Sequence, residues 1–234
     1  MTVSAMAPLL LSAAKQMSIP TMLLELTEAF GTTLLIFVFT LLGALPLGMI
    51  VYFGKKSRIA PIRWFVNGYI SVMRGTPLML QLIVVYFAPN LVFHMSLPSN
   101  WRMIAVVIAF IINYSAYFAE IYRAGIESIP VGQYEAAQVL GYNKVQTFFK
   151  IILPQMIKRV IPPVTNEIIT LVKDTSLSSA IAVMEMFTLA KKIANSPGSP
   201  GMITLFAAGV FYYVFNYLVA FVMRRIEKRL NYFE

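Results

Sequence analysis

Cysteine is absent from this chain of 234 residues, and charged residues make up only 12% of it. The lack of cysteine excludes a disulfide framework and any thiolate metal site. Histidine is represented by His94 alone, so the chain has no histidine cluster for metal binding or acid–base catalysis. Without a histidine or cysteine cluster, and with no cluster of nucleophilic side chains in the sequence, the chain lacks the residues expected of an enzyme active site.

Hydrophobic residues, in contrast, make up 59% of the chain. A soluble domain is about 45–50% apolar and about 25% charged, so the excess points to a polytopic membrane protein. The net charge of +9 is spread along the chain, and we therefore expect no binding to nucleic acid. No basic residue precedes the short apolar run at the N-terminus, which argues against a cleaved signal peptide.

Five apolar segments approach the roughly 20 residues that a membrane-spanning helix needs. The second contains Arg74, and the fourth contains Glu167, Lys173 and Asp174. The predicted spans are about 30–54, 62–89, 102–122, 160–183 and 202–223. The chain is thus expected to be all-α, with one transmembrane domain over 30–230 after an external tail over 1–29.

The distribution of Lys and Arg predicts the orientation, because cytoplasmic loops carry an excess of both residues. Basic residues gather in the loop 54–63, in the loop after the third span and in the C-terminal tail. The segments 1–30, 90–102 and 184–201 have few of them. This alternation places the N-terminus outside and the C-terminus inside, with the loop 125–158 in the cytoplasm.

The stretch "YEAAQVLGYNKVQTFFKIILPQ", residues 134–155, differs from the rest because it is amphipathic. Apolar residues recur at helical spacing on both sides of Gly141. Since glycine adopts a left-handed backbone readily, Gly141 is expected to join two short helices into an elbow. The apolar face of this elbow could lie on the bilayer surface or against another protein.

The spacing within this stretch resembles the EAA signature of permease subunits of ABC importers, E-A-A-x3-G-x9-I-x-L-P. The resemblance implies that the elbow docks into a groove on a separate cytoplasmic ATPase. The residues that would carry this coupling are Glu135, Ala136, Ala137, Gly141, Ile151, Leu153 and Pro154.

Other segments resemble the polar amino-acid branch of that family. "MRGTPLMLQL" (73–82) is similar to its R-G-T-P segment, and "LVKDTSLSSAIAV" (171–183) is similar to its K-D-T/S-S-L segment. The resemblance implies an importer of polar amino acids in the bacterial cell (inner) membrane, as a multi-pass protein. It also implies two ATPase copies, a second permease subunit that we expect to be an identical chain, and an external solute-binding protein.

Nucleotide binding is not expected in this chain. "GKKS" at 54–57 lacks the earlier glycine of a P-loop and has Lys56 where the motif needs Ser or Thr. ATP and Mg²⁺ would be bound by the partner ATPase, and the chain itself is predicted not to be an enzyme. A channel or a secondary transporter that works without ATP is the alternative, although neither class needs the elbow.

Charged residues within spans are costly and are functional candidates by default, although they could equally pair to hold the bundle together. An amino-acid zwitterion needs a cation for its carboxylate and an anion for its ammonium. Gly75 and Pro77 also suggest a broken or kinked second span that lines a cavity, or a plain proline kink. The predicted substrate path consists of Arg74, Thr76, Gln81, Tyr117, Glu120, Lys173, Asp174 and Ser176. The particular amino acid stays open.

Overall fold

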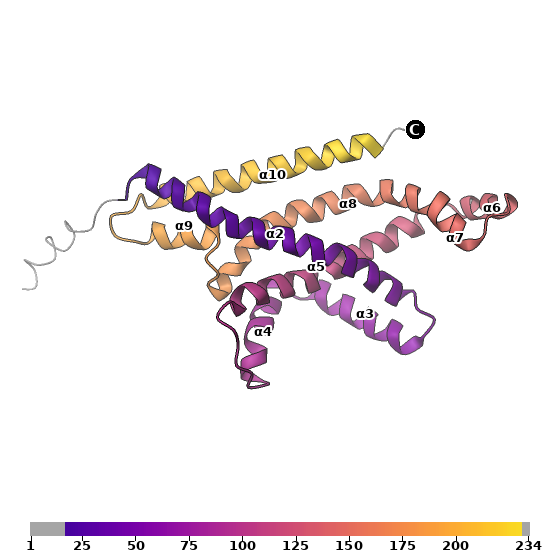
Figure 1. The fold of residues 1–234 in the computed structure, drawn as a ribbon, viewed down its shortest axis with the longest axis horizontal. Coiled ribbons are helices and arrows are strands. Elements are labelled where there is room, and N and C mark those ends of the chain that lie inside the picture. Colours follow the sequence, from indigo (N-terminus) through magenta and orange to yellow (C-terminus); the bar gives the residue numbers. More distant parts are fainter. Residues whose placement is uncertain (1–16, 231–234) are drawn as a thin grey trace, which may run out of the picture.

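The computed structural model describes residues 17–230, which form an elongated bundle of helices without any strand in that range (Figure 1). The all-α prediction is therefore confirmed for this part of the chain. The helices are α2 (Ile19–Lys55), α3 (Ala60–Gly75), α4 (Leu78–Leu91), α5 (Trp101–Glu127), α6 (Val131–Val139), α7 (Lys144–Thr147), α8 (Leu153–Asp174), α9 (Met186–Ala194) and α10 (Met202–Leu230). A π-helical turn, η1 (Phe148–Ile152), precedes α8, and a 3₁₀ helix, η2 (Thr175–Ile181), follows it.

Helix α2 begins at Ile19, earlier than the expected start near residue 30. Ser18 caps it, because its side chain accepts a hydrogen bond from Thr21 N, and Pro20 lies in the first turn. Glu25 and Glu28 interrupt the apolar pattern there, so the helix extends beyond the apolar stretch from which the span 30–54 is predicted. Residues 19–29 of the predicted external tail are thus helical, and residues 1–16 lie outside the described part.

Helices α2 and α5 form the centre of the bundle, and small residues allow their close approach. A Cβ on Gly48 would lie 2.8 Å from Phe118 Cβ, and one on Gly43 would lie 2.3 Å from Ile111 Cδ1. Larger residues at these positions would push the two helices apart. Phe110, Phe118 and Leu171 are completely buried around this contact.

The predicted span 62–89 contains the break that Gly75 and Pro77 suggested, since α3 and α4 meet at an angle of 114°. The break falls at Gly75-Thr76-Pro77, where Pro77 has no amide hydrogen to continue the helix. Gln81 Nε2 donates to the main-chain oxygens of Met73 and Thr76, both at 3.1 Å. Asn113 on α5 also donates to Met73 O, at 3.0 Å. The unwound backbone is therefore held by side-chain amides.

By length and composition, three described helices could cross a membrane: α2, α5 and α10. The bent pair α3–α4 makes a fourth if it counts as one span. Helix α8 does not meet this criterion, since its apolar face is balanced by a polar one. The prediction of five spans is therefore not confirmed as a number.

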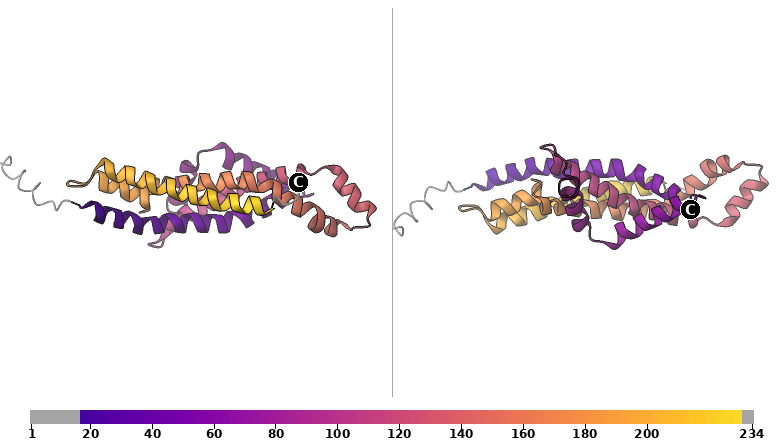
Figure 2. Two further views of the ribbon diagram at one scale, coloured as in Figure 1. Left: turned by 90° about the horizontal axis from the view of Figure 1, so that it is seen from above. Right: turned by 90° about the horizontal axis from the view of Figure 1, so that it is seen from below.

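The basic segments that the Lys and Arg pattern grouped together lie at one end of the bundle, whereas the segment 90–102 projects from its side (Figure 1). The α2–α3 connection, α6, α7 and the end of α10 point to one end of the bundle, while the start of α2 and α9 lie at the other (Figures 1 and 2). Which end faces the cytoplasm remains a prediction from the basic residues.

Candidate functional site

The elbow is built by Gly141, which has the left-handed φ of 76°. Gly141 N donates to Gln138 O and Tyr142 N donates to Ala137 O, both at 3.0 Å. These two bonds form the motif that ends a helix with glycine in the left-handed conformation. A Cβ on Gly141 would meet nothing within 4 Å, so glycine is needed for its backbone conformation and not for space.

The second arm of the elbow begins at Asn143. Its side chain accepts from Gln146 N at 2.9 Å, while Gln146 Oε1 accepts from Asn143 N at 3.0 Å. This reciprocal capping box starts α7 directly after the glycine turn. Helices on both sides of Gly141 are therefore present, but only α6 is a separate short helix, because α7 continues without a break through η1 into α8. The turn at Gly141 and the start of α7 are both defined by neighbours in sequence.

The elbow projects from the end of the bundle and carries uncovered apolar side chains (Figure 1). Val139 is 88% exposed and Leu140 is 72% exposed, so neither packs against the rest of the chain. A hollow of about 670 Å³ lies inside the elbow. Its lining residues are Tyr134, Gln138, Tyr142, Asn143, Lys144, Thr147 and Phe148.

The predicted coupling residues divide by exposure. Glu135 and Ala136 are exposed, whereas Ala137 is buried on the inner side of α6. Ile151 and Leu153 are half-buried where η1 leads into α8. Pro154 lies in the first turn of α8, directly after Leu153. Some residues of the motif thus pack inside the elbow and at its root, whereas others lie on its exposed surface.

The root of the elbow is fixed between α5 and α8. Arg159 Nη1 donates to Ser128 O at 2.5 Å, and Gln155 Nε2 donates to Gln133 Oε1 at 3.0 Å. Ile129 and Met156 are buried beneath these contacts. A displacement of the elbow would therefore move both helices.

A charged cavity of about 580 Å³ lies between α5 and α8, next to the elbow root. Arg74 stands at its edge, with its guanidinium 5.4 Å from the centre of the Tyr117 ring and 3.8 Å from Glu120 Oε2. Because Arg74 is nearly half exposed, its guanidinium is open to a further anion. Glu167 lines the same cavity from α8.

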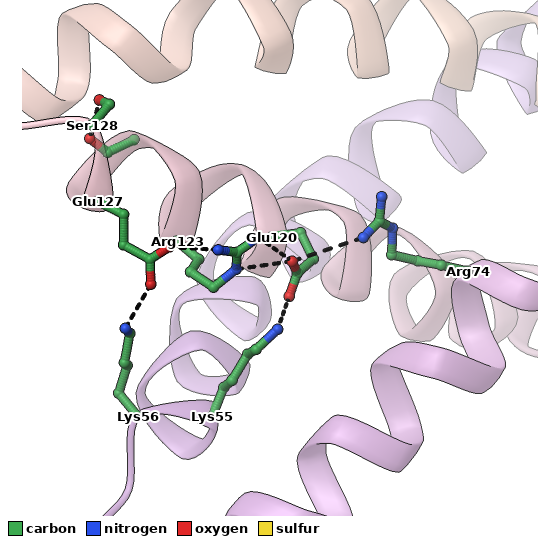
Figure 3. Close-up of polar contacts among 8 residues, drawn as sticks. Lys55, Lys56, Arg74, Glu120, Arg123, Glu127 and Ser128 are labelled. Carbon is green, nitrogen blue, oxygen red and sulfur yellow. Dashed lines mark hydrogen bonds and ion pairs between the residues drawn. The ribbon is translucent and has the colours of Figure 1, made fainter.

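Glu120 differs from Arg74 because its carboxylate is already well paired (Figure 3). Lys55 Nζ donates to Glu120 Oε1, and Arg123 Nε donates to Glu120 Oε2 at 2.9 Å. Arg123 also reaches Glu127 at 2.5 Å, and Lys56 reaches Glu127 at 2.7 Å. This ionic network ties the end of α2 to the last turns of α5, and it favours a structural role for Glu120.

A smaller cavity of about 230 Å³ opens farther along α8 and shares Tyr117 and Glu167 with the first. Thr76 and Asp174 line it, and Asp174 Oδ2 accepts from the Tyr114 hydroxyl at 2.7 Å. Glu167 and Asp174 face one cavity because seven residues are close to two helical turns. Together the two cavities are lined by three cations, Arg74, Arg123 and Arg159, and by three carboxylates, Glu120, Glu167 and Asp174.

The remaining predicted path residues lie elsewhere. Lys173 and Ser176 line a separate hollow of about 330 Å³ beside α9 and α10. The side-chain amide of Gln81 already makes hydrogen bonds at the break between α3 and α4, where it also donates to Thr76 Oγ1 at 2.7 Å. The structure therefore places Arg74, Thr76, Tyr117, Glu120 and Asp174 around two adjoining cavities and separates Lys173 and Ser176 from them.

Sequence reasoning missed Glu185, whose side chain is completely buried at the start of α9. The sequence signal is weak, because a glutamate at the start of a short amphipathic helix is typical of an ordinary helix N-terminus. Among the described residues, no group of three acidic, histidine or cysteine side chains could hold a metal ion.

A helical membrane bundle with a jointed elbow at one end and a charged cavity above it defines the membrane subunit of a transport system. Comparison with known proteins gives the family. Residues 44–232 match the family described as "Binding-protein-dependent transport system inner membrane component", and the chain belongs to this family. It is a multi-pass protein of the bacterial inner membrane and, as a permease component, is not itself an enzyme.

Named relatives place the chain among permeases. It is 36% identical to the L-cystine transport system permease protein TcyB of Bacillus subtilis, over 85% of this chain and 82% of that protein. It is 34% identical to the arginine transport system permease protein ArtQ of the same organism, over 87% and 91%. A crystal structure of an amino acid ABC transporter with histidines superposes with a TM-score of 0.81 at 29% identity, over 92% and 100%. The resemblance noted from the sequence motifs is thus confirmed.

Proposed function

We propose that this chain forms half of the translocation path of an ATP-driven importer of polar amino acids. Two copies would pair in the membrane, two ATPase subunits would bind the elbows, and an external binding protein would deliver the substrate. The relatives support the substrate class, since TcyB and ArtQ are permease proteins of an L-cystine and an arginine transport system.

The uncovered elbow is the observation that carries the coupling proposal. Its apolar residues Val139 and Leu140 project at the end of the bundle and contact no other part of the described chain closely enough to be buried. A groove on an ATPase would cover them. Closure of two ATPases on ATP would then move the elbows, and the fixed root at Arg159 and Ser128 would carry the motion into α5 and α8.

The two cavities support a path for a zwitterion. Arg74 can hold a carboxylate in a bidentate fork, while Asp174 and Glu167 can accept from an ammonium. Tyr117 and Glu167 line both cavities, so the two charged regions adjoin one another. A ligand can shift a conformational equilibrium only if it binds the two states with different affinities. Here ATP would be that ligand, and the elbow motion would carry the shift from the cytoplasmic ATPases to the cavities.

Reconstitution of the complete importer in vesicles tests the proposal. Gly141→Val should retain ATP hydrolysis but lose ATP-dependent uptake, because a β-branched residue is strained at a left-handed φ. Gly141→Asn should retain more uptake, since asparagine tolerates this conformation. Gly132→Ala is the matched control, as it adds a Cβ to α6 where nothing lies within 4 Å.

Two results would contradict the proposal. Full coupling in the Gly141→Val variant would remove the elbow from the mechanism. Accumulation of substrate by the permease alone, without nucleotide, would favour a channel or secondary transporter. The substrates for the assay are labelled L-cystine, L-arginine and L-glutamine.

A further inference from the structure

Glu185 is a completely buried carboxylate whose bonds all come from neutral donors. Its Oε1 accepts from Thr188 N at 2.7 Å and from Thr188 Oγ1 at 2.8 Å. Its Oε2 accepts from Phe187 N at 2.8 Å and from the Tyr212 hydroxyl at 3.0 Å. Within the described residues, no lysine, arginine or histidine forms an ion pair with it.

This arrangement does more than cap a short helix. Helix caps usually employ Ser, Thr, Asp or Asn, whose short side chains need no burial. Burial of a carboxylate is costly unless each oxygen is satisfied, and here every donor has to keep its place. A shift of α9 away from α10 would take the Tyr212 hydroxyl from the carboxylate and leave a buried charge short of a donor.

Four elements meet at this point. Tyr212 belongs to α10, and its hydroxyl also lies 3.4 Å from Thr175 Oγ1 in η2. Thr33 of α2 accepts from Met186 N at 3.2 Å. Because Thr33, Thr175 and Glu185 are all fully buried, water cannot substitute for a lost partner. Helix α9 is therefore joined to η2 through polar contacts as well as through the chain.

The connection leads directly to the cavity wall. Thr175 is the residue after Asp174, which lines the smaller cavity. At the other end of η2, Ala182 has a left-handed φ of 55°, and only residues 182–184 separate η2 from Glu185. Because this connection is short, a displacement of α9 would also move η2 and, with it, Asp174 at the other end of η2.

The opposite face of α9 is free to receive a partner. Met186, Ala190 and Ile193 are buried toward α2 and α10, whereas Lys191 and Lys192 are exposed. The helix lies at the end of the bundle away from the elbow (Figure 2). It thus presents two cations on the side where the basic-residue pattern places the outside of the cell.

We propose that Glu185 is a positioning residue that transmits contact at the exposed face of α9 to the cavity wall at Asp174. The inference rests on the proposed function, because the contacting partner is the external binding protein of the importer. Docking on α9 displaces η2 through the Glu185–Tyr212–Thr175 contacts, and the cavity then changes shape for the arriving substrate.

The test measures ATP hydrolysis by the complete importer in vesicles, with and without its substrate-loaded binding protein. Tyr212→Phe removes one donor to Glu185 and keeps the ring. Tyr213→Phe is its matched control, since Tyr213 is the next residue on α10 and is 73% exposed. Glu185→Gln provides a second variant that keeps the side-chain size and removes the charge.

The expected result is a loss of stimulation by the binding protein of at least about fivefold in Tyr212→Phe, within the usual range of coupling between sites. Basal hydrolysis and the concentration of binding protein that gives half-maximal stimulation should stay as in the wild type. Tyr213→Phe should behave as the wild type. Glu185→Gln should show the same loss whenever it is recovered in the membrane.

Unaltered stimulation in Tyr212→Phe would overturn the inference, and so would a parallel fall of basal and stimulated hydrolysis, which indicates a purely structural role. Failure of the proposed function gives a different result, because the wild type would then show neither stimulation nor ATP-dependent uptake. Retained coupling in Gly141→Val would likewise contradict the elbow proposal and leave the result for Glu185 intact.

Discussion

Gly125 of α5 and Val160 of α8 lie so close together that a Cβ on Gly125 would be 2.2 Å from Val160 Cγ1. Met156 packs beside the same contact, 3.5 Å from that Cβ position. The two helices that carry the elbow are therefore in direct backbone-level contact just above its root. Under the coupling proposal, this close packing would carry a displacement of the elbow into α5 and α8 together.

Substitution of Gly125 by alanine should overpack this contact. We expect Gly125→Ala to destabilise the permease by about 1–3 kcal/mol, because Val160 lies on a packed helix and cannot move freely. Thermal unfolding of the purified protein in detergent measures the change. Gly31→Ala is the control, since a Cβ there meets nothing within 4 Å, and equal melting of both variants would contradict the prediction.

Replacement of Asn113 by leucine should weaken the break in the second span. Asn113 Nδ2 donates to Met73 O at 3.0 Å and to Gln81 Oε1 at 2.9 Å, and leucine would leave both acceptors with one donor fewer. The expected loss is about 1–3 kcal/mol of stability, typical of a buried group left unsatisfied. Asn166→Leu, on an exposed position of α8, should melt as the wild type does.

Cavity substitutions should separate path residues from their neighbours. Arg74→Ala and Asp174→Ala should each abolish amino-acid uptake while the ATPase remains bound, because they remove the charges that face a zwitterion. Lys173→Ala should reduce uptake much less, since Lys173 lines the hollow beside α9 instead. Uptake and ATPase co-purification are measured on the same membranes, and normal uptake by both cavity variants would refute the zwitterion site.

The Lys56–Glu127 pair should stabilise the bundle over the whole physiological pH range. The hydrogen bond to Glu127 raises the pKa of Lys56. A raised lysine pKa contributes stability below the unfolded value of about 10.4, and the contribution is lost as pH rises through the folded value. The melting difference between wild type and Lys56→Gln should therefore be constant from about pH 6 to 9.

Salt provides the control for this pair, because both side chains are largely exposed to solvent. The melting difference should shrink at about 1 M salt, where the Debye length falls to roughly 3 Å. A difference that grows with salt, or that disappears between pH 6 and 9, would show that the pair does not act through charge.

Local chemistry made the elbow predictable. Gly141 and Asn143 determine both bends through bonds to residues no more than five positions away, so their types and spacing are sufficient. The shared face of Glu167 and Asp174 follows equally from helical periodicity. In both cases the interacting groups are neighbours along one element.

Long-range pairing was not predictable in the same way. Lys55 and Glu120 are 65 positions apart, and nothing in either neighbourhood indicates the partner. Glu120 was therefore assigned to the substrate path on charge alone. The bend of 114° between α3 and α4 also depends on Asn113 from another helix, which propensity at Pro77 does not specify.

The shape of the elbow is self-contained, since its glycine turn and capping box use only residues of the segment itself. The elbow can consequently be treated as a separate structural unit. The segment could be exchanged between permeases to alter which ATPase they accept, whereas a redesign of the charged cavity would have to keep Ser128 and Arg159, because this pair both lines the cavity and fixes the root of the elbow.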